Sequence, residues 1–152
     1  MTTKTVSVKQ ANMPISMKHV HEIAEFITNK PVDTAIASLE NVLKKKQGIP
    51  FKKYQSKGHK HGVPTGYPQK ATKFMIRLLK QLKANAKDSG EARVIIKSYF
   101  LGRSGYPRYL SGKVSRGGKR TYIKIVGEYE VQEKAQQPQQ VSEAVGNAKD
   151  NK

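Results

Sequence analysis

The amino-acid sequence predicts an α+β fold, in which three helices pack on a small antiparallel sheet with a long extended β-hairpin. Before Gly90, apolar residues recur at helical spacing in three segments. After Gly90 the spacing changes to two, as expected for strands. About 17 residues (103–119) join the two strand-like segments, far more than the two to five of an ordinary hairpin turn. We therefore expect the strands to continue past the body as a hairpin extension at about 97–124.

The first helix is expected within ISMKHVHEIAEFITNK, residues 15–30. Ser16 is a suitable N-cap, and Ile15 and Val20 are spaced as a hydrophobic staple. One helical face collects the apolar residues Met17, Val20, Ile23, Ala24 and Ile27.

The second helix is expected from about Asp33 to Lys46, and it should form a helical hairpin with the first. Lysines 44–46 complement the negative end of the helix dipole, and Gly48 and Pro50 then stop the helix. Its buried residues should be Ile36, Leu39 and Leu43.

The third helix should begin at Pro68 and run to about Asp88, before Gly90. One half of its helical wheel is apolar: Ala71, Phe74, Met75, Leu78, Leu79, Leu82 and Ala86. The other half is cationic: Lys70, Lys73, Arg77, Lys80, Lys83 and Lys87. Six cations with no anion on this face favour contact with a polyanion over a merely solvated surface.

The two strands are RVIIKSYFLG, residues 93–102, and KRTYIKIVGEYE, residues 119–130. Alternation places Val94 and Ile96 with Phe100 on one face of the first strand, and Ile123 with Ile125 on one face of the second.

Two segments are too polar to pack as regular elements. Residues 48–69 are rich in Gly, Pro, Lys and His, and a loop of this length is usually functional. Residues 132–152 have few apolar anchors and are expected to form a disordered tail. The domain prediction is therefore one domain over residues 1–131 followed by this tail.

Positive charge is concentrated in one region. The net charge is +18, yet residues 41–127 hold 22 Lys and Arg against only Asp88 and Glu91. Nucleic acid is the commonest partner of such a surface. The absence of cysteine excludes disulfides and thiolate metal sites, and no signal peptide or apolar span is visible, so we expect a soluble cytoplasmic protein without membrane contact.

Catalytic chemistry has little support in the residues. His59 and His61 lack a nearby acid or cysteine that would complete a metal site, and KVSRGGKR departs from the phosphate-binding loop pattern. No paired carboxylates are visible in the basic region. We therefore expect no enzyme activity, no cofactor and no metal.

RNA contact is the chemistry that the basic region favours, because Lys and Arg bind phosphates while Tyr and Arg planes stack on unpaired bases. The predicted RNA-binding residues are Lys18, Lys52, Lys53, Tyr54, Lys57, His59, Lys60, His61, Lys70, Lys73, Arg77, Lys80, Lys97, Arg103, Arg116, Lys119, Arg120, Tyr122 and Lys124.

Four stretches, in this order, resemble the universal large-subunit ribosomal protein family numbered twenty-two in bacteria and seventeen in eukaryotes. They are ISMKHVHEIAEFITNKPVDTAIASLENVL, PFKKY with GHKHG, GYPQKATKFMIRLLKQLKANAKDSG, and PRYLSGKV with KRTYIKIV. The segment from Pro50 to Tyr67 is similar to an insertion of the archaeal and eukaryotic branch, so an archaeal-type chain is expected.

The resemblance implies a structural constituent of the large ribosomal subunit whose body binds large-subunit rRNA and whose hairpin lines the nascent-polypeptide exit tunnel. The tunnel tip would comprise Tyr106, Arg108, Tyr109, Gly112 and Lys113. The implied partners are rRNA, neighbouring large-subunit proteins and the nascent polypeptide, without a homo-oligomer. The alternatives are a basic RNA-processing enzyme with His59 or His61 as general base, and a free nucleic-acid-binding protein.

Overall fold

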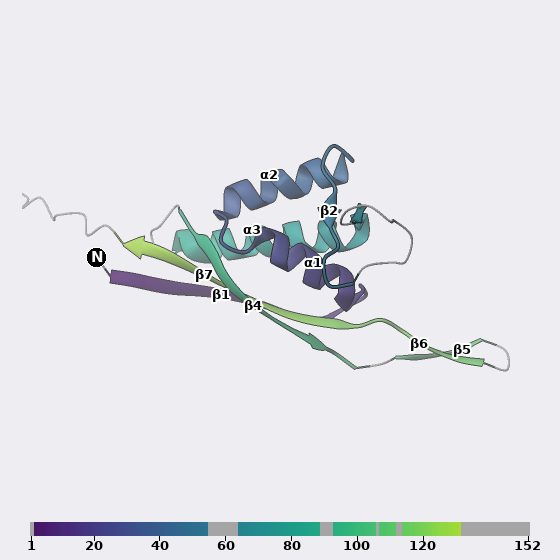
Figure 1. Ribbon diagram of the computed structural model, residues 1–152. Coiled ribbons are helices and arrows are strands. Elements are labelled where there is room, and N and C mark those ends of the chain that lie inside the picture. The colour runs from purple at the N-terminus through teal and green to yellow at the C-terminus, as the bar shows by residue number, and fades with distance from the viewer. Residues whose placement is uncertain (1, 55–63, 89–92, 106, 112–113, 132–152) are drawn as a thin grey trace, which may run out of the picture.

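Three helices cover one face of a three-stranded antiparallel sheet in the computed structural model, and a narrow hairpin projects from one end of the sheet (Figure 1). The structure describes all residues except 1, 55–63, 89–92, 106, 112–113 and 132–152. This two-layer arrangement confirms the expected α+β fold. The expected disordered tail lies outside the described residues and stays a prediction.

The sheet contains β1 (Thr2–Met13), β7 (Thr121–Val131) and β4 (Ile95–Arg103), in the order β1-β7-β4. β7 is central, and its alternate residues Ile123 and Ile125 are fully buried under the helices, as predicted. β1 was not predicted from the sequence. This strand alternates Val6 and Val8 with polar residues, but it has few large apolar side chains to mark it.

The helices are α1 (Met17–Ile27), α2 (Val32–Leu43) and α3 (Gln69–Asp88). α3 lies at the centre of the helical layer and contacts β1, α1 and α2. The expected hairpin of the first two helices is therefore wrong in its packing, because α2 packs mainly on α3 while α1 packs on α3 and the sheet. Among the described helices, none has the length and apolar character required to cross a bilayer.

The apolar half of α3 is core, as predicted: Met75, Leu78, Leu79, Leu82 and Ala86 are fully buried, and Ala71 nearly so. In α1, the residues Val20, Ile23, Ala24 and Ile27 are buried, while Ser16 occupies the N-cap position without forming a side-chain cap hydrogen bond.

α2 ends three residues before the predicted end. Lys45 has a φ of 57°, and the backbone N–H groups of Lys45 and Lys46 donate to the carbonyl oxygens of Val42 and Asn41 at 3.1 and 2.9 Å. This is the Schellman arrangement, with lysine in place of the usual glycine. Ala35 and Val42 are fully buried with Leu39, whereas Ile36 and Leu43 are only partly buried.

A β-bulge in β4 reverses the predicted orientation of Phe100. Ile96 pairs with Gly127 and Ser98 with Val126, so Lys97 is an extra residue. Such an insertion sends all later side chains to the opposite face. Val94 and Ile96 are buried as predicted, but Phe100 is 58% exposed, and Tyr99 and Leu101 pack against the core instead.

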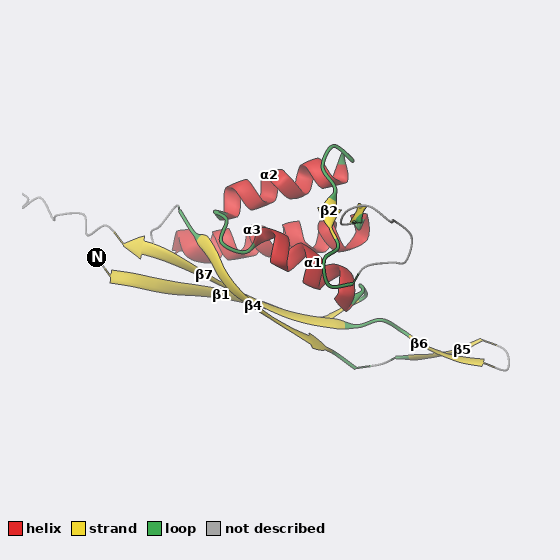
Figure 2. Cartoon of the chain, in the orientation of Figure 1, coloured by secondary structure: helices red, strands yellow, loops and turns green. Residues whose placement is uncertain are grey.

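The hairpin continues beyond the sheet as β5 (Arg108–Ser111) paired with β6 (Val114–Gly117), which Figure 2 shows at the far end of the extension. The Ser104 N–H donates to the Arg120 carbonyl at 3.2 Å, and the Gly118 N–H donates to that of Pro107 at 2.7 Å. These bonds join the distal ladder to the body, as the long connection predicted.

The polar segment after α2 was predicted to contain no regular element, which is wrong at its two ends. β2 (Ile49–Pro50) pairs with β3 (Thr65–Gly66), and the Phe51 N–H donates to the Pro64 carbonyl at 2.8 Å. Ile49 is fully buried, and it therefore attaches the start of this polar segment to the body.

Candidate nucleic-acid interface

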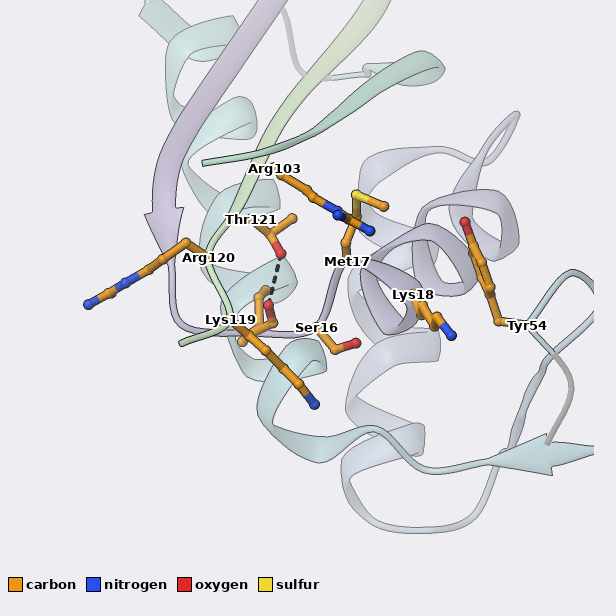
Figure 3. A pocket seen from close by; sticks show the side chains of 9 residues that line it. Ser16, Met17, Lys18, Tyr54, Arg103, Lys119, Arg120 and Thr121 are labelled. Atoms are coloured by element: carbon orange, nitrogen blue, oxygen red, sulfur yellow. Dashed lines mark hydrogen bonds between the residues drawn. The ribbon is translucent and has the colours of Figure 1, made fainter. Parts of the chain in front are cut away.

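Four predicted cations meet where the hairpin leaves the body. We call this site the hairpin-root pocket; it has a volume of about 370 Å³ and is lined by Ile15, Ser16, Met17, Lys18, Tyr54, Arg103, Lys119, Arg120 and Thr121. Figure 3 shows its residues coming from the start of α1, from Tyr54 and from both arms of the hairpin. The first turn of α1 has no acidic residue, so its unpaired N–H groups and positive dipole end add to the cationic charge. The arrangement suits an anionic group such as a backbone phosphate.

Hydrogen bonds to β1 and the following turn fix the geometry of this pocket. The buried Thr121 hydroxyl donates to the Ile15 carbonyl at 2.8 Å, as drawn in Figure 3. Arg120 donates to the Asn12 carbonyl at 3.0 Å, and the Ser104 hydroxyl bonds to the Asn12 side chain. Asn12 itself has a φ of 56°, a backbone conformation that asparagine tolerates better than most residues. The two hairpin arms are thereby tied to the end of β1.

A second pocket continues the first toward β2 and β3. It shares Ser16, Lys18, Tyr54 and Lys119 with the hairpin-root pocket and adds His19 and Phe51. Partial burial and the nearby charge of Lys119 lower the pKa of His19 below its ordinary value. The imidazole is therefore neutral at pH 7, and the positive charge here comes from Lys and Arg.

The predicted cations of α3 form an exposed row, which we call the α3 stripe: Lys70, Lys73, Arg77 and Lys80. A shallow pocket beside Lys73, Arg77 and Lys80 also includes Gln81 and Ala84. The expectation that this helical face meets no anion is wrong for Lys83, whose ammonium group pairs with Asp33 of α2. Lys83 therefore serves to join two helices, while the four residues of the stripe face solvent.

A buried carboxylate holds the turn that carries Lys52, Lys53 and Tyr54. Glu22 of α1 is 1% exposed, and its two oxygens accept the three consecutive backbone N–H groups at 3.0, 3.0 and 2.8 Å. The side chains of Lys52 and Lys53 remain exposed. Glu22 was not predicted, because an acid in an amphipathic helix gives no sign in the sequence that distant N–H groups will surround it.

His21, Glu22 and Glu25 are the group among the described residues that approaches a metal-binding arrangement, with donor atoms within 4.8 Å of one another. Both oxygens of Glu22 already accept backbone hydrogen bonds, and the ammonium group of Lys52 lies 3.7 Å from Glu25. The carboxylate of Glu22 is thus engaged by backbone donors, whereas Glu25 has only longer ionic contacts. His59 and His61, which were predicted to contact RNA and not a metal, lie outside the described residues.

Three predicted RNA-binding residues, Lys97, Tyr122 and Lys124, belong to the face of the sheet opposite the helices. Lys97 forms an ion pair with Glu128 at 3.6 Å, whereas Tyr122 and Lys124 are half-buried on the central strand. Lys9 pairs in register with Lys124. It was not predicted as a site residue, because β1 itself was not predicted.

The distal hairpin carries three further predicted residues, away from the helical body. Arg108 is exposed on β5, Tyr109 follows it on the same strand, and Arg116 lies on β6. The other predictions fall outside the described residues: Lys57, His59, Lys60, His61, Tyr106, Gly112 and Lys113. The candidate interface thus comprises the hairpin-root pocket, the α3 stripe, the turn at 52–54 and the open side of the sheet.

Comparison with known proteins identifies the family of this chain. Residues 8–113 match the family model of ribosomal protein L22p/L17e. The chain is 33% identical over 138 residues to the large ribosomal subunit protein uL22 of Archaeoglobus fulgidus, covering 83% of this chain and 89% of the relative. It is 39% identical over 89 residues to uL22 of Staphylothermus marinus and 41% over 87 residues to that of Methanoculleus marisnigri; each match spans 57% of the relative. The chain therefore belongs to the ribosomal protein L22p/L17e family and is of the archaeal type.

Proposed function

We propose that this protein is a structural constituent of the large ribosomal subunit in the cytoplasm, where its body binds large-subunit rRNA. Family membership supports this role, because the relatives are named as large-subunit proteins. The observation that carries the proposal is the excess of 20 positive charges over residues 41–127, together with the exposure of the predicted cations on α3 and at the hairpin root.

The proposed mechanism is neutralisation of packed RNA by a rigid scaffold. Exposed Lys and Arg side chains bind phosphates and release condensed counterions, which favours association without chemical change to the RNA. The buried core, and the hydrogen bonds from Ser104 and Arg120 to Asn12, hold these cations in fixed relative positions. Such preorganisation lowers the entropic cost of binding a folded RNA.

The hairpin is proposed to reach the nascent-polypeptide exit tunnel and form part of its wall. Its distal ladder of β5 and β6 stands away from the helical body (Figure 1). β5 and β6 pair with each other and add little to the core of the body. This is consistent with a hairpin that serves to contact a distant surface and not to stabilise the fold. The proposed partners are rRNA, neighbouring large-subunit proteins and, at the tip, the nascent chain; no cofactor or enzyme activity is required.

Co-sedimentation tests the proposal. Tagged protein expressed in an archaeal host should travel with the large subunit in a sucrose gradient, both when high magnesium joins the subunits and when low magnesium separates them. Protein that stays at the top of the gradient at both magnesium concentrations, while the host's own large-subunit proteins move with the particle, would contradict the proposal.

A further inference from the structure

The face of the sheet that carries no described helix bears an exposed aromatic side chain. Phe100 is 58% exposed and Ile95, on the same face of β4, is 42% exposed, although both are large apolar residues. Solvent exposure of a phenylalanine forgoes the favourable free energy of burying its ring. The bulge at Lys97 creates this exposure, because a regular strand would have directed Phe100 toward the helices with Ile96. Bulges that redirect a side chain are often found beside functional sites.

Cations lie in register with this ring. Phe100 pairs with Lys124 on β7, and Lys124 pairs with Lys9 on β1, so the three side chains form one row across the sheet. Neither lysine has an ion-pair partner among the described residues, whereas Lys97 at the end of the face pairs with Glu128. Two positive groups in the same row as an aromatic ring are therefore available to an anionic ligand.

A second aromatic residue, Tyr122, lies on the same face of the sheet, diagonal to Phe100. Tyr122 pairs with Gly102, and a Cβ atom added at Gly102 would lie 3.7 Å from the Tyr122 ring. The tyrosine thus covers the glycine on the same face as Phe100. Because Phe100 and Tyr122 are diagonal neighbours on adjacent strands, their Cβ atoms are about 7–8 Å apart or less.

We propose that this face, formed by Phe100, Tyr122, Lys9 and Lys124, binds an unpaired segment of RNA by stacking bases on the two rings. The lysines would bind the phosphates that flank the stacked bases. Open sheet faces with aromatic residues on adjacent strands suit single-stranded RNA, because unstacked bases can splay onto them, whereas a continuous duplex keeps its bases stacked internally. This inference rests on the proposed RNA-binding function and adds a binding mode that phosphate contacts alone would not provide.

A single-tryptophan variant tests the stacking directly. The chain contains no tryptophan, so Phe100→Trp introduces one fluorophore into the proposed platform. Titration with a ten-nucleotide oligouridylate should quench its fluorescence at low salt. Tyr67→Trp is the matched control, because Tyr67 is 46% exposed but precedes α3 rather than lying on the sheet. Equal quenching of the two variants, or no quenching at position 100, would overturn the platform.

Affinity measurements separate stacking from charge. Phe100→Ala should weaken oligouridylate binding roughly 5- to 150-fold, and Phe100→Tyr should restore most of the loss. Lys9→Ala and Lys124→Ala should each reduce the slope of log K against log salt by about 0.7, the value expected for one phosphate contact on a single strand. Circular dichroism of each variant checks that the fold is retained. An affinity unchanged by Phe100→Ala in a folded protein would contradict stacking.

A crosslink in the assembled particle distinguishes RNA from a protein occupant. Benzoylphenylalanine at position 100 should crosslink to rRNA in purified large subunits, at nucleotides that are unpaired. Exclusive crosslinking to a neighbouring protein would overturn the RNA assignment while leaving ribosomal incorporation intact. Failure of the wild-type chain to enter the particle would instead contradict the proposed function, so the two failures are distinguishable.

Discussion

Single buried residues beneath the candidate interface hold its cationic side chains in place. Glu22 is the clearest case, because one buried carboxylate satisfies three consecutive N–H groups and thereby places Lys52 and Lys53 at the surface. Glu25, one turn later on α1, is an exposed acid with only distant ionic contacts at 3.7 and 3.9 Å. These two glutamates allow a matched comparison.

Glu22→Ala should destabilise the protein by about 2–4 kcal/mol, since it leaves buried donors without their charged acceptor. Glu22→Gln should lose less, because its remaining oxygen can keep some of these bonds. The midpoint of urea unfolding measures both effects. Glu25→Gln is the control and should change stability by less than about 0.5 kcal/mol. A similar loss for Glu22→Ala and Glu25→Gln would show that the buried carboxylate does not hold the turn.

Gly127 faces the bulge and leaves no room for a side chain. An added Cβ would lie 2.5 Å from Val94 Cγ1 and 3.5 Å from Leu82 Cδ2. Gly127→Ala should therefore cost about 1–3 kcal/mol through overpacking. Gly105→Ala, where no atom lies within 4 Å of the added Cβ, should change stability by less than about 0.5 kcal/mol. Thermal unfolding of the two variants gives the comparison, and equal midpoints would contradict this packing.

At the scale of elements, the sequence was informative where one periodic pattern determined the structure. α3 follows its predicted bounds because seven apolar positions and an uninterrupted cationic face describe one amphipathic helix. The distal hairpin was predicted on another ground, the length of the connection between the two strand-like segments. β1 was missed because its small and polar residues become a strand only through pairing with β7 along most of its length.

Features that depend on contacts between distant segments could not be read from one sequence. The orientation of Phe100 reflects a bulge set by the register of β4 against β7, and the hairpin-root pocket requires Ile15, Tyr54 and Arg120 to meet. Charge patterning predicted the cations, but not which of them lie together, and their contacts with RNA stay a prediction. Lys83 is an example: the sequence places it on the cationic face of α3, but its pairing with Asp33 arises only from the packing of α2 on α3.

The α3 stripe provides a test at this scale. If its exposed cations bind phosphates, Lys73→Ala, Arg77→Ala and Lys80→Ala should each reduce the slope of log K against log salt by roughly 0.7–0.9 in binding to large-subunit rRNA. Lys83→Ala should leave the slope nearly unchanged, because this ammonium group already pairs with Asp33. Filter binding at several salt concentrations measures the slopes. Unchanged slopes for all three stripe variants would indicate that the stripe is merely solvated.

At the scale of the whole molecule, we expect the body to fold without the extension. Ser104 and Arg120 are the last hairpin residues tied to Asn12, and a backbone hydrogen bond joins them. Replacing residues 105–119 with Asn-Gly keeps this pair in register with a two-residue type I′ turn. The replacement removes Lys119 from the hairpin-root pocket. The shortened protein should still fold and enter the large subunit, because the core, the α3 stripe and the pocket cations Lys18, Arg103 and Arg120 are retained.

The shortened hairpin should change the tunnel without preventing translation. Nascent chains of increasing length, each carrying a photo-crosslinker, should lose their crosslinks to this protein in particles with the shortened hairpin. Translation past a stalling peptide should also change, while bulk synthesis continues. Identical crosslinks at every chain length would show that the extension does not reach the nascent chain.

The most direct test of the central claim is a density map of the large subunit that contains this chain. We expect the α3 stripe and the hairpin-root pocket to contact rRNA phosphates, and residues 105–118 to extend into the wall of the exit tunnel. A map in which the chain is absent from the subunit, or in which the cationic surfaces face solvent and the hairpin points away from the tunnel, would contradict it.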